Sequence, residues 1–250
     1  MADFQSRENR AFAYEIKALI PVEQARDVRE WARARMQPDP NTASGAGDVY
    51  RITSLYYDTW GFDVFHRRGS FGRSKYRVRR YDSSPLVFLE RKLRNQSIVT
   101  KRRTLVEIAE LGRLRGLLAD RAWAGSWFHG RMLARAMSPA CQISYSRTAL
   151  VSQTGAGLIR LTLDEDLRAW RVTQPEYVPL AGGTPLLRDH TILELKFRLA
   201  MPPLFKQMLE EFHLCPQPVS KYQLAVTGIG CAPRSVPVET GALEIEAAYA

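Results

Sequence analysis

The feature that most limits the fold of this chain is a pattern of cations at every second residue of strand-like segments. In SKYRVRRY, residues 74–81, Lys75, Arg77 and Arg79 alternate with Tyr76 and Val78. Because successive side chains of a β-strand point to opposite faces, the three cations share one face and the apolar side chains share the other. The segment therefore predicts a strand with a strongly basic face.

The same alternation returns in six other segments that are typical of strands. In each, mainly charged or polar side chains share one face, and apolar side chains in most cases occupy the opposite face. The shared-face residues are Glu15 and Lys17 in 11–21, Phe88, Glu90, Lys92 and Arg94 in 86–95, Lys101 and Arg103 in 98–104, Tyr145 and Arg147 in 141–151, Arg160 and Thr162 in 157–166, and Glu194, Lys196 and Arg198 in 191–199.

For any single strand, an ordinary solvated basic face explains this pattern. Like charges opposite one another in a sheet are destabilising, however, so solvated faces normally mix both signs. Here cations dominate and carboxylates occur singly among them. The recurrence favours a sheet that curls into a barrel with its charged face inward, around a polyanion that arginine side chains can bind in a bidentate manner.

The net charge supports an anionic partner. The 250 residues include 36 Lys and Arg against 26 Asp and Glu, which gives a net charge of +10. Between Arg73 and Arg103 alone, eleven cations stand against Asp82 and Glu90. A surplus concentrated in one segment indicates a binding surface for nucleic acid, nucleotide, anionic lipid or a phosphate polymer.

The chain predicts an α+β fold. Seven or eight strands with mostly short connections favour antiparallel pairing. Apolar residues at helical spacing predict helices in 22–36, within 105–137 (most clearly from Ser126), after Pro203 and near Ser220. No linker divides the chain, so we expect one domain over residues 1–230 and a mobile tail over 231–250.

Several other classes of protein and site are disfavoured. Three widely spaced cysteines fit neither a disulfide framework nor a zinc site, and no signal peptide or transmembrane segment is evident, which favours a cytoplasmic protein. The chain has neither a P-loop nor protein-kinase motifs. The four histidines lack metal-like spacing, and the acidic trio Asp164, Glu165 and Asp166 is expected to form a solvated turn.

Six motifs in order carry a resemblance to a known family. They are the K-x-R-x-R strand, ERK, Y-x-R-T, R-x-T-x-D, L-E-L-K-F and S-K-Y, and YYDT at 56–59 also fits. From about residue 10 to 228 the chain resembles the VTC domain, the polyphosphate polymerase module of the triphosphate tunnel metalloenzyme superfamily. The resemblance implies an eight-stranded antiparallel tunnel that binds ATP and Mn²⁺ or Mg²⁺ and transfers the γ-phosphoryl group of ATP to inorganic polyphosphate.

The resemblance also implies residue roles. Phosphate-contacting catalytic roles fall to Arg77, Arg79, Lys92, Arg147 and Lys196, and substrate-binding roles to Lys17, Lys101, Tyr145, Arg160, Ser220 and Lys221. Glu194 matches the metal-holding glutamate of the family. Arg94, Arg103 and Arg198 share the inward parity with weaker motif matches, whereas Arg80, Arg91 and Arg102 should point away.

One departure bears on the reaction. The hydrolytic branch of the superfamily carries E-x-E-x-K on its first strand, whereas this chain has Ala13, Glu15 and Lys17. The missing glutamate favours polymerase over triphosphatase, which remains an alternative together with a non-catalytic polyphosphate-binding or nucleic-acid-binding module. Specific nucleic-acid binding is not expected, since recognisable motifs are lacking.

Overall fold

The computed structural model describes residues 7–8, 14–40, 47–95 and 98–232. Among these residues, eight long strands and three two-residue strands form one sheet, and every pairing is antiparallel. The long strands are β2 (Tyr14–Pro21), β4 (Val49–Thr59), β5 (Ser74–Tyr81), β6 (Leu86–Asn95), β7 (Ile98–Glu107), β8 (Met137–Thr154), β9 (Gly157–Arg171) and β11 (His190–Phe197). The short ones are β1 (Arg7–Glu8), β3 (Gln37–Pro38) and β10 (Thr184–Pro185). The α+β class and the antiparallel pairing are confirmed.

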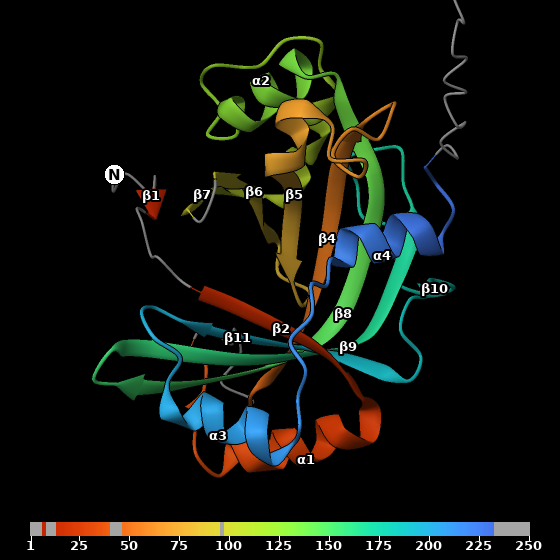
Figure 1. Ribbon diagram of the computed structural model, residues 1–250. Helices are drawn as coiled ribbons and strands as arrows, with labels where there is room; N and C mark the ends of the chain where they lie inside the picture. The colour runs from red at the N-terminus through yellow and green to blue at the C-terminus, as the bar shows by residue number, and fades with distance from the viewer. Residues whose placement is uncertain (1–6, 9–13, 41–46, 96–97, 233–250) are drawn as a thin grey trace, which may run out of the picture.

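The strands pair in the order β1-β7-β6-β5-β4-β8-β9-β11-β2, with β3 on β8 and β10 on β9 beside this path. Among the described residues, no ladder joins β2 to β7, so the sheet is not closed by backbone hydrogen bonds. The expected closed barrel is therefore not observed as such. The sheet bends so that β2, β9 and β11 lie across from the half that contains β5 and β6 (Figure 1).

Helices α1 (Val22–Arg33) and α3 (Pro203–Glu211) cover the outer face of β2, β9 and β11 (Figure 1). Ala25, Val28 and Trp31 of α1 recur at helical spacing and are buried in this layer. They pack into a hydrophobic cluster with Leu161 and Phe205. The helices expected after Pro21 and at Pro203 are thus confirmed, and they leave the opposite face of these strands to the charged residues.

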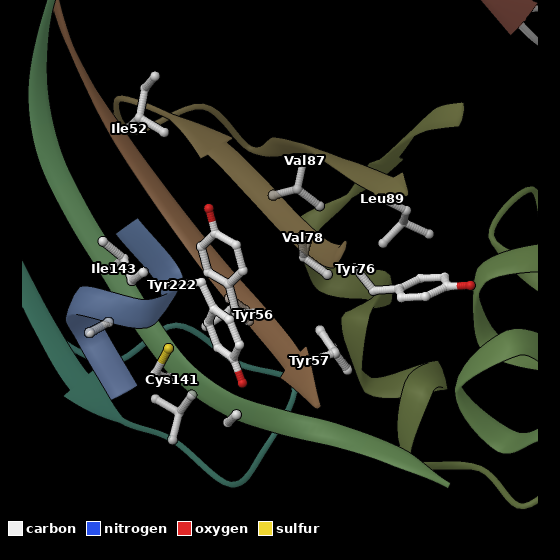
Figure 2. Close-up of a cluster of buried hydrophobic side chains, with 14 of the residues drawn as sticks. Ile52, Tyr56, Tyr57, Tyr76, Val78, Val87, Leu89, Cys141, Ile143 and Tyr222 are labelled. Atoms are coloured by element: carbon white, nitrogen blue, oxygen red, sulfur yellow. The ribbon is translucent and has the colours of Figure 1, made fainter. Parts of the chain in front are cut away.

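The second hydrophobic cluster lies around β4, β5, β6 and β8. It is covered by α2 (Ser126–Ala134) and α4 (Lys221–Gly228), with the 3₁₀ helices η1 (Gly69–Arg73) and η2 (Ile108–Arg115) nearby. Figure 2 shows Val78, Val87 and Leu89 in this cluster, with the rings of Tyr56 and Tyr222 beside one another. The expectation of helix across 105–137 was only partly right, because β7 extends to Glu107 and only 126–134 is α-helical.

Strands β8 and β9 contribute to both clusters. Ile143 and Ala149 of β8 pack in the cluster under α2 and α4, whereas Leu150 packs under α1 and α3. Likewise, Leu167 and Leu161 of β9 belong to different clusters. The two strands therefore hold the halves of the cation-rich face together. The expected tail over 231–250 lies outside the described residues from 233 onward.

Candidate functional site: a cation-lined face with shared carboxylates

Cross-strand register brings the predicted residues onto one face. Glu194 of β11 lies opposite Lys17 of β2 on one side and Thr162 of β9 on the other. In the other half of the sheet, Arg77 of β5 lies opposite Glu90 of β6. Because directly opposed residues point to the same side of a sheet, the alternation read from the sequence places these side chains as expected.

Glu194 is a carboxylate of this face that contacts four cations. Its side chain is only 7% exposed, and its oxygens lie 3.0 Å from Lys17 Nζ, 3.2 Å from Lys221 Nζ, 3.6 Å from Lys196 Nζ and 3.8 Å from Arg147 Nη2. Burial alone would raise the pKa of Glu194, but these cations hold it well below its usual range. The group is therefore a carboxylate anion at any physiological pH.

Asp164 corrects the expectation of a solvated acidic turn. Its side chain is fully buried, and both of its oxygens accept hydrogen bonds from Arg147, at 2.6 and 2.7 Å. Lys221 Nζ lies 2.5 Å from the same carboxylate. Of its sequence neighbours, Glu165 pairs with Arg29 of α1 and Asp166 is exposed. Asp164 thus orients two of the predicted phosphate-contacting cations.

Glu90 organises a second group of cations on β5, β6 and β7. Its buried carboxylate lies 2.7 Å from Arg77 Nε, 3.0 Å from Lys101 Nζ and 4.0 Å from Arg79 Nε. Arg77 also donates to the Tyr56 hydroxyl at 3.2 Å, and Arg79 to the Tyr145 hydroxyl at 3.4 Å. These contacts fix the directions of the paired arginines.

Glu15 links the two halves of the face. It contacts Lys17 on its own strand at 2.9 Å, Lys196 of β11 at 3.6 Å and Lys92 of β6 at 3.4 Å. Burial opposes ionisation, but Lys196 and the other lysines lower the pKa of Glu15 to about 2. Since β2 and β6 are remote in the strand order, this contact shows that the ends of the sheet approach each other through side chains.

A row of three lysines crosses β5, β6 and β7. Lys75 lies directly opposite Lys92, and Lys92 lies directly opposite Lys101. Like charges in such positions repel one another. Burial and the nearby cations Lys17, Lys92 and Arg77 lower the pKa of Lys75 to about 8, although its residue remains accessible to solvent. Glu15 and Glu90 compensate the charges of Lys92 and Lys101, so the electrostatically unfavourable member of the row is Lys75.

The start of α4 completes the face. Ser220 is the N-cap residue, and its Oγ accepts a hydrogen bond from the backbone of Gln223 at 3.4 Å. Lys75 donates to the same Oγ at 2.9 Å. Lys221 follows directly and bridges Glu194 and Asp164, with its Nζ 5.0 Å from the centre of the Tyr145 ring. Tyr145 is buried, so it forms part of the wall.

Arg160 departs from the rest of the predicted set. It shares the face by register, opposite Lys196, but its guanidinium binds Asp39 at 2.9 Å and the Tyr50 hydroxyl at 3.0 Å. Among the second-rank arginines, Arg103 stacks on Phe88 and Arg198 is exposed. The side chain of Arg94 and all of Ala13 lie outside the described part of the chain.

The cations expected to point away from the tunnel face make contacts unlike those of the inward set. Arg80 donates to the backbone oxygens of Ser83 and Ser84, each at 2.8 Å, and Arg102 stacks on Trp127 at 4.3 Å. The sequence reading left four residues of the site without a role, although all four share the inward parity: Glu15, Lys75, Glu90 and Asp164. Parity was the signal that could have found Asp164 as well, because it is two residues beyond Thr162.

The family resemblance predicts a metal ion at Glu194. The residues there suit such an ion only if substrate phosphates supply some of its ligands. Within the described ranges, no group of three His, Cys, Asp or Glu side chains could hold a metal ion by itself. Thr162 Oγ1, opposite Glu194, is buried, and no described residue forms a hydrogen bond with it. Mg²⁺ typically uses one or two carboxylates together with waters and substrate phosphates. Glu194 and the Thr162 hydroxyl suit such a partial site.

Fold and face together define a protein that concentrates cations on a concave antiparallel sheet. The model of the VTC domain family matches residues 12–228, and the chain belongs to this family. The family is part of the triphosphate tunnel superfamily, whose enzymes act on triphosphates. A comparison with curated proteins gives no match. No helix within the described ranges is both long and apolar enough to cross a membrane.

Solved structures resemble the chain at low sequence identity, and three of them serve as examples. A protein of Bacillus halodurans, provisionally named an adenylate cyclase, is 14% identical with a TM-score of 0.49, over 82% of this chain and 92% of that one. A provisionally named adenylyl cyclase from Hippeastrum, described as having a dominant triphosphatase activity, is 15% identical with a TM-score of 0.48, over 86% and 95%. A Pyrococcus horikoshii protein is 13% identical with a TM-score of 0.47, over 87% and 98%.

Proposed function

We propose that this protein is a metal-assisted polyphosphate polymerase that transfers the γ-phosphoryl group of ATP to the end of an inorganic polyphosphate chain, inside a tunnel formed by the concave sheet. The observation that carries the proposal is the gathering of cations from both halves of the sheet on one face, around Glu194 and Asp164 in one half and around Glu90 in the other. A face with so many cations favours an anionic ligand. A linear phosphate chain has the charge density and the shape to contact successive cations of this face.

The face offers positions for a donor and for an acceptor. One group of cations surrounds Glu194 and Asp164, and another surrounds Glu90. The two groups are connected through Glu15, which contacts lysines of both halves. Phosphoryl transfer depends mainly on alignment and charge neutralisation, so a protein that holds two phosphate chains end to end supplies most of what the reaction needs.

The phosphate-holding residues form two groups according to their position on the face. Arg147, Lys196 and Lys221 hold one set of phosphate oxygens beside Glu194, whereas Arg77, Arg79 and Lys101 hold another set beside Glu90. A Mg²⁺ or Mn²⁺ ion held by Glu194 and substrate oxygens would neutralise charge on the transferred group. The acceptor phosphate is already ionised at neutral pH, so no general base is required.

Triphosphate hydrolysis is the competing reaction. The chain carries Ala13 where the hydrolytic branch of the superfamily has its first glutamate. One carboxylate fewer weakens the means of binding and activating an attacking water. Glu15 does not take over the role of the missing glutamate, because three lysines already contact the Glu15 carboxylate. These features favour transfer to phosphate over transfer to water.

Incubation of the purified protein with ATP, Mg²⁺ or Mn²⁺ and a short polyphosphate primer tests the proposal. Gel electrophoresis and phosphorus NMR should detect lengthened polyphosphate together with ADP. Lys196→Met should lose this activity, whereas Arg26→Met, an equal change of charge on α1, should retain it. Orthophosphate as the sole phosphate product, at a rate independent of primer, would identify a triphosphatase. Polyphosphate binding without any turnover would identify a binding module.

A further inference from the structure

Lys75 differs from the other lysines of the concave face in what neutralises it. Lys17, Lys92, Lys101, Lys196 and Lys221 each contact at least one carboxylate. Within the part of the chain that the structure describes, the recorded polar contact of Lys75 is with the neutral hydroxyl of Ser220 at 2.9 Å. Its positive charge is therefore available to an anion.

Ser220 retains one hydrogen-bonding function. Its oxygen accepts from Lys75 Nζ and from the backbone N–H of Gln223, which occupies both of its lone pairs. A serine hydroxyl has one hydrogen to donate and two lone pairs. The Ser220 O–H is thus left as a donor beside the Lys75 ammonium, and phosphate oxygens are suitable acceptors for both groups.

The segment before α4 connects two strands that are remote in the strand order. Gln217 N donates to Lys17 O at 2.8 Å, and Lys17 Nζ donates to Val219 O at 3.4 Å. One residue later, Ser220 contacts Lys75 of β5. The segment therefore runs from β2 to β5, and Lys75 lies where it meets the strand, at the amino-terminal end of β5.

A second cation lies beside the first turn of α4. Arg67 is exposed, and its Nη2 donates to Gln223 Oε1 at 3.1 Å. Its backbone has a φ of 56°, and a Cβ at Gly72 would lie 2.7 Å from Arg67 O. Only glycine at 72 permits this close turn. The tight loop positions Arg67 beside α4.

We infer that Lys75, Ser220 and Arg67 form an additional anion subsite at the edge of the concave face, and that it binds phosphate groups of a chain longer than a triphosphate. The inference rests on the proposed function, because it assigns part of the same polyanion. The buried cations around Glu194 and Glu90 account for a triphosphate. Phosphates beyond these would pass Lys75 first and then reach Arg67 across the turn that carries Ser220 and Gln223.

Calorimetric binding of tripolyphosphate and of long-chain polyphosphate tests the subsite. Lys75→Met and Arg67→Met should each weaken binding of the long chain roughly tenfold, the effect of one charge-assisted hydrogen bond, and should change tripolyphosphate binding much less. Lys75→Arg should recover most of the loss. Arg26→Met, which removes one charge from α1 on the outer face, should bind both ligands as the unmodified protein does.

The outcomes separate this inference from the proposed function. Equal losses for both ligands would place Lys75 and Arg67 with the triphosphate site, and no loss for the long chain would exclude the subsite. Either result would leave the proposed function standing if the unmodified protein binds both ligands. Failure of the unmodified protein to bind either ligand would overturn both proposals.

Discussion

The hydroxyl of Tyr222 donates a 2.5 Å hydrogen bond to the buried carboxylate of Asp58. Asp58 also accepts backbone hydrogen bonds from Thr59, Val64 and Phe65, so it fixes the loop after β4. The Tyr222 ring stacks on Tyr56 with centroids 5.3 Å apart (Figure 2). Through this pair, the loop after β4 sets the position of α4 and hence of Lys221, the neighbour of Tyr222.

Tyr222→Phe should preserve the stacking and remove the hydroxyl. Burial and the Asp58 charge raise the pKa of Tyr222, so the hydroxyl is a donor at all ordinary pH values. We expect a loss of about 1.5–3 kcal/mol in the free energy of unfolding, typical of a hydrogen bond to a charged group. Urea denaturation measures it. Tyr14→Phe, at a tyrosine that is 59% exposed, should change stability by less than about 0.5 kcal/mol. Equal effects would contradict the assignment.

Glu194→Gln should abolish metal-stimulated turnover and lower stability in the absence of ligand. Four cations share this carboxylate, and removal of one partner of a buried charge group leaves the others uncompensated. Added tripolyphosphate should restore much of the lost thermal stability, because a bound anion supplies the missing charge. Thermal denaturation with and without tripolyphosphate provides the measurement.

The matched control for this variant is Glu165→Gln on β9. Glu165 pairs with Arg29 of α1 on the outer face. The substitution therefore removes the same charge as Glu194→Gln, but away from the cation-lined face. Its turnover should match that of the unmodified protein, and tripolyphosphate should stabilise both to the same extent. A normal metal-stimulated rate in Glu194→Gln would remove this residue from the reaction.

Lys75→Met should raise the thermal stability of the ligand-free protein while it weakens polyphosphate binding. The pKa of Lys75 in the folded protein, about 8, lies below the ordinary value of 10.5. Folding is therefore opposed by the charged form, and this penalty is fully present below pH 8 and disappears as pH rises toward 10.5. At pH 7 we expect an increase in Tm of about 1–2 °C. A decrease in Tm would show that the charge of Lys75 is already compensated without a ligand.

Polyphosphate binding near pH 8 should be accompanied by proton uptake. The groups around Lys75 are Tyr56, Lys17, Lys92 and Arg77, and the three cations among them favour its neutral form. A bound phosphate chain reverses this field and raises the pKa of Lys75. Affinity should consequently fall as pH rises through 8. Calorimetry in buffers of different ionisation enthalpy measures the protons taken up, and Lys75→Met should take up fewer. Identical uptake in both proteins would assign the protons to another group.

Strand parity predicted much of the site because it depends on local geometry alone. Glu194 and Lys196 point to one face for the same reason that Leu193 and Leu195 are buried on the other. The contacts between strands were less accessible to this reasoning. Nothing in the local sequence around Lys92 indicates that it meets Glu15, because that contact depends on the bending of the whole sheet.

The acidic trio shows where the local pattern misled. A run of three carboxylates is typical of a turn, yet β9 continues through it to Arg171. The register between β8 and β9 shifts between Ser144 and Ser146, and Asp166 has a φ of 48°. Such a bulge redirects neighbouring side chains. Asp164 keeps the inner parity of Thr162, whereas the bulge takes Asp166 out of the alternation, so the three carboxylates do not act as one turn.

The sharing of β8 and β9 between the two hydrophobic clusters has a consequence for unfolding. A break in either cluster removes packing from strands that the other cluster also needs, so neither half can open without weakening the other. The described fold should therefore unfold as one cooperative unit, with the slowest amide hydrogen exchange along the middle of β8 and β9. A ligand that binds beside Arg147, near the centre of β8, would slow exchange in both halves at once.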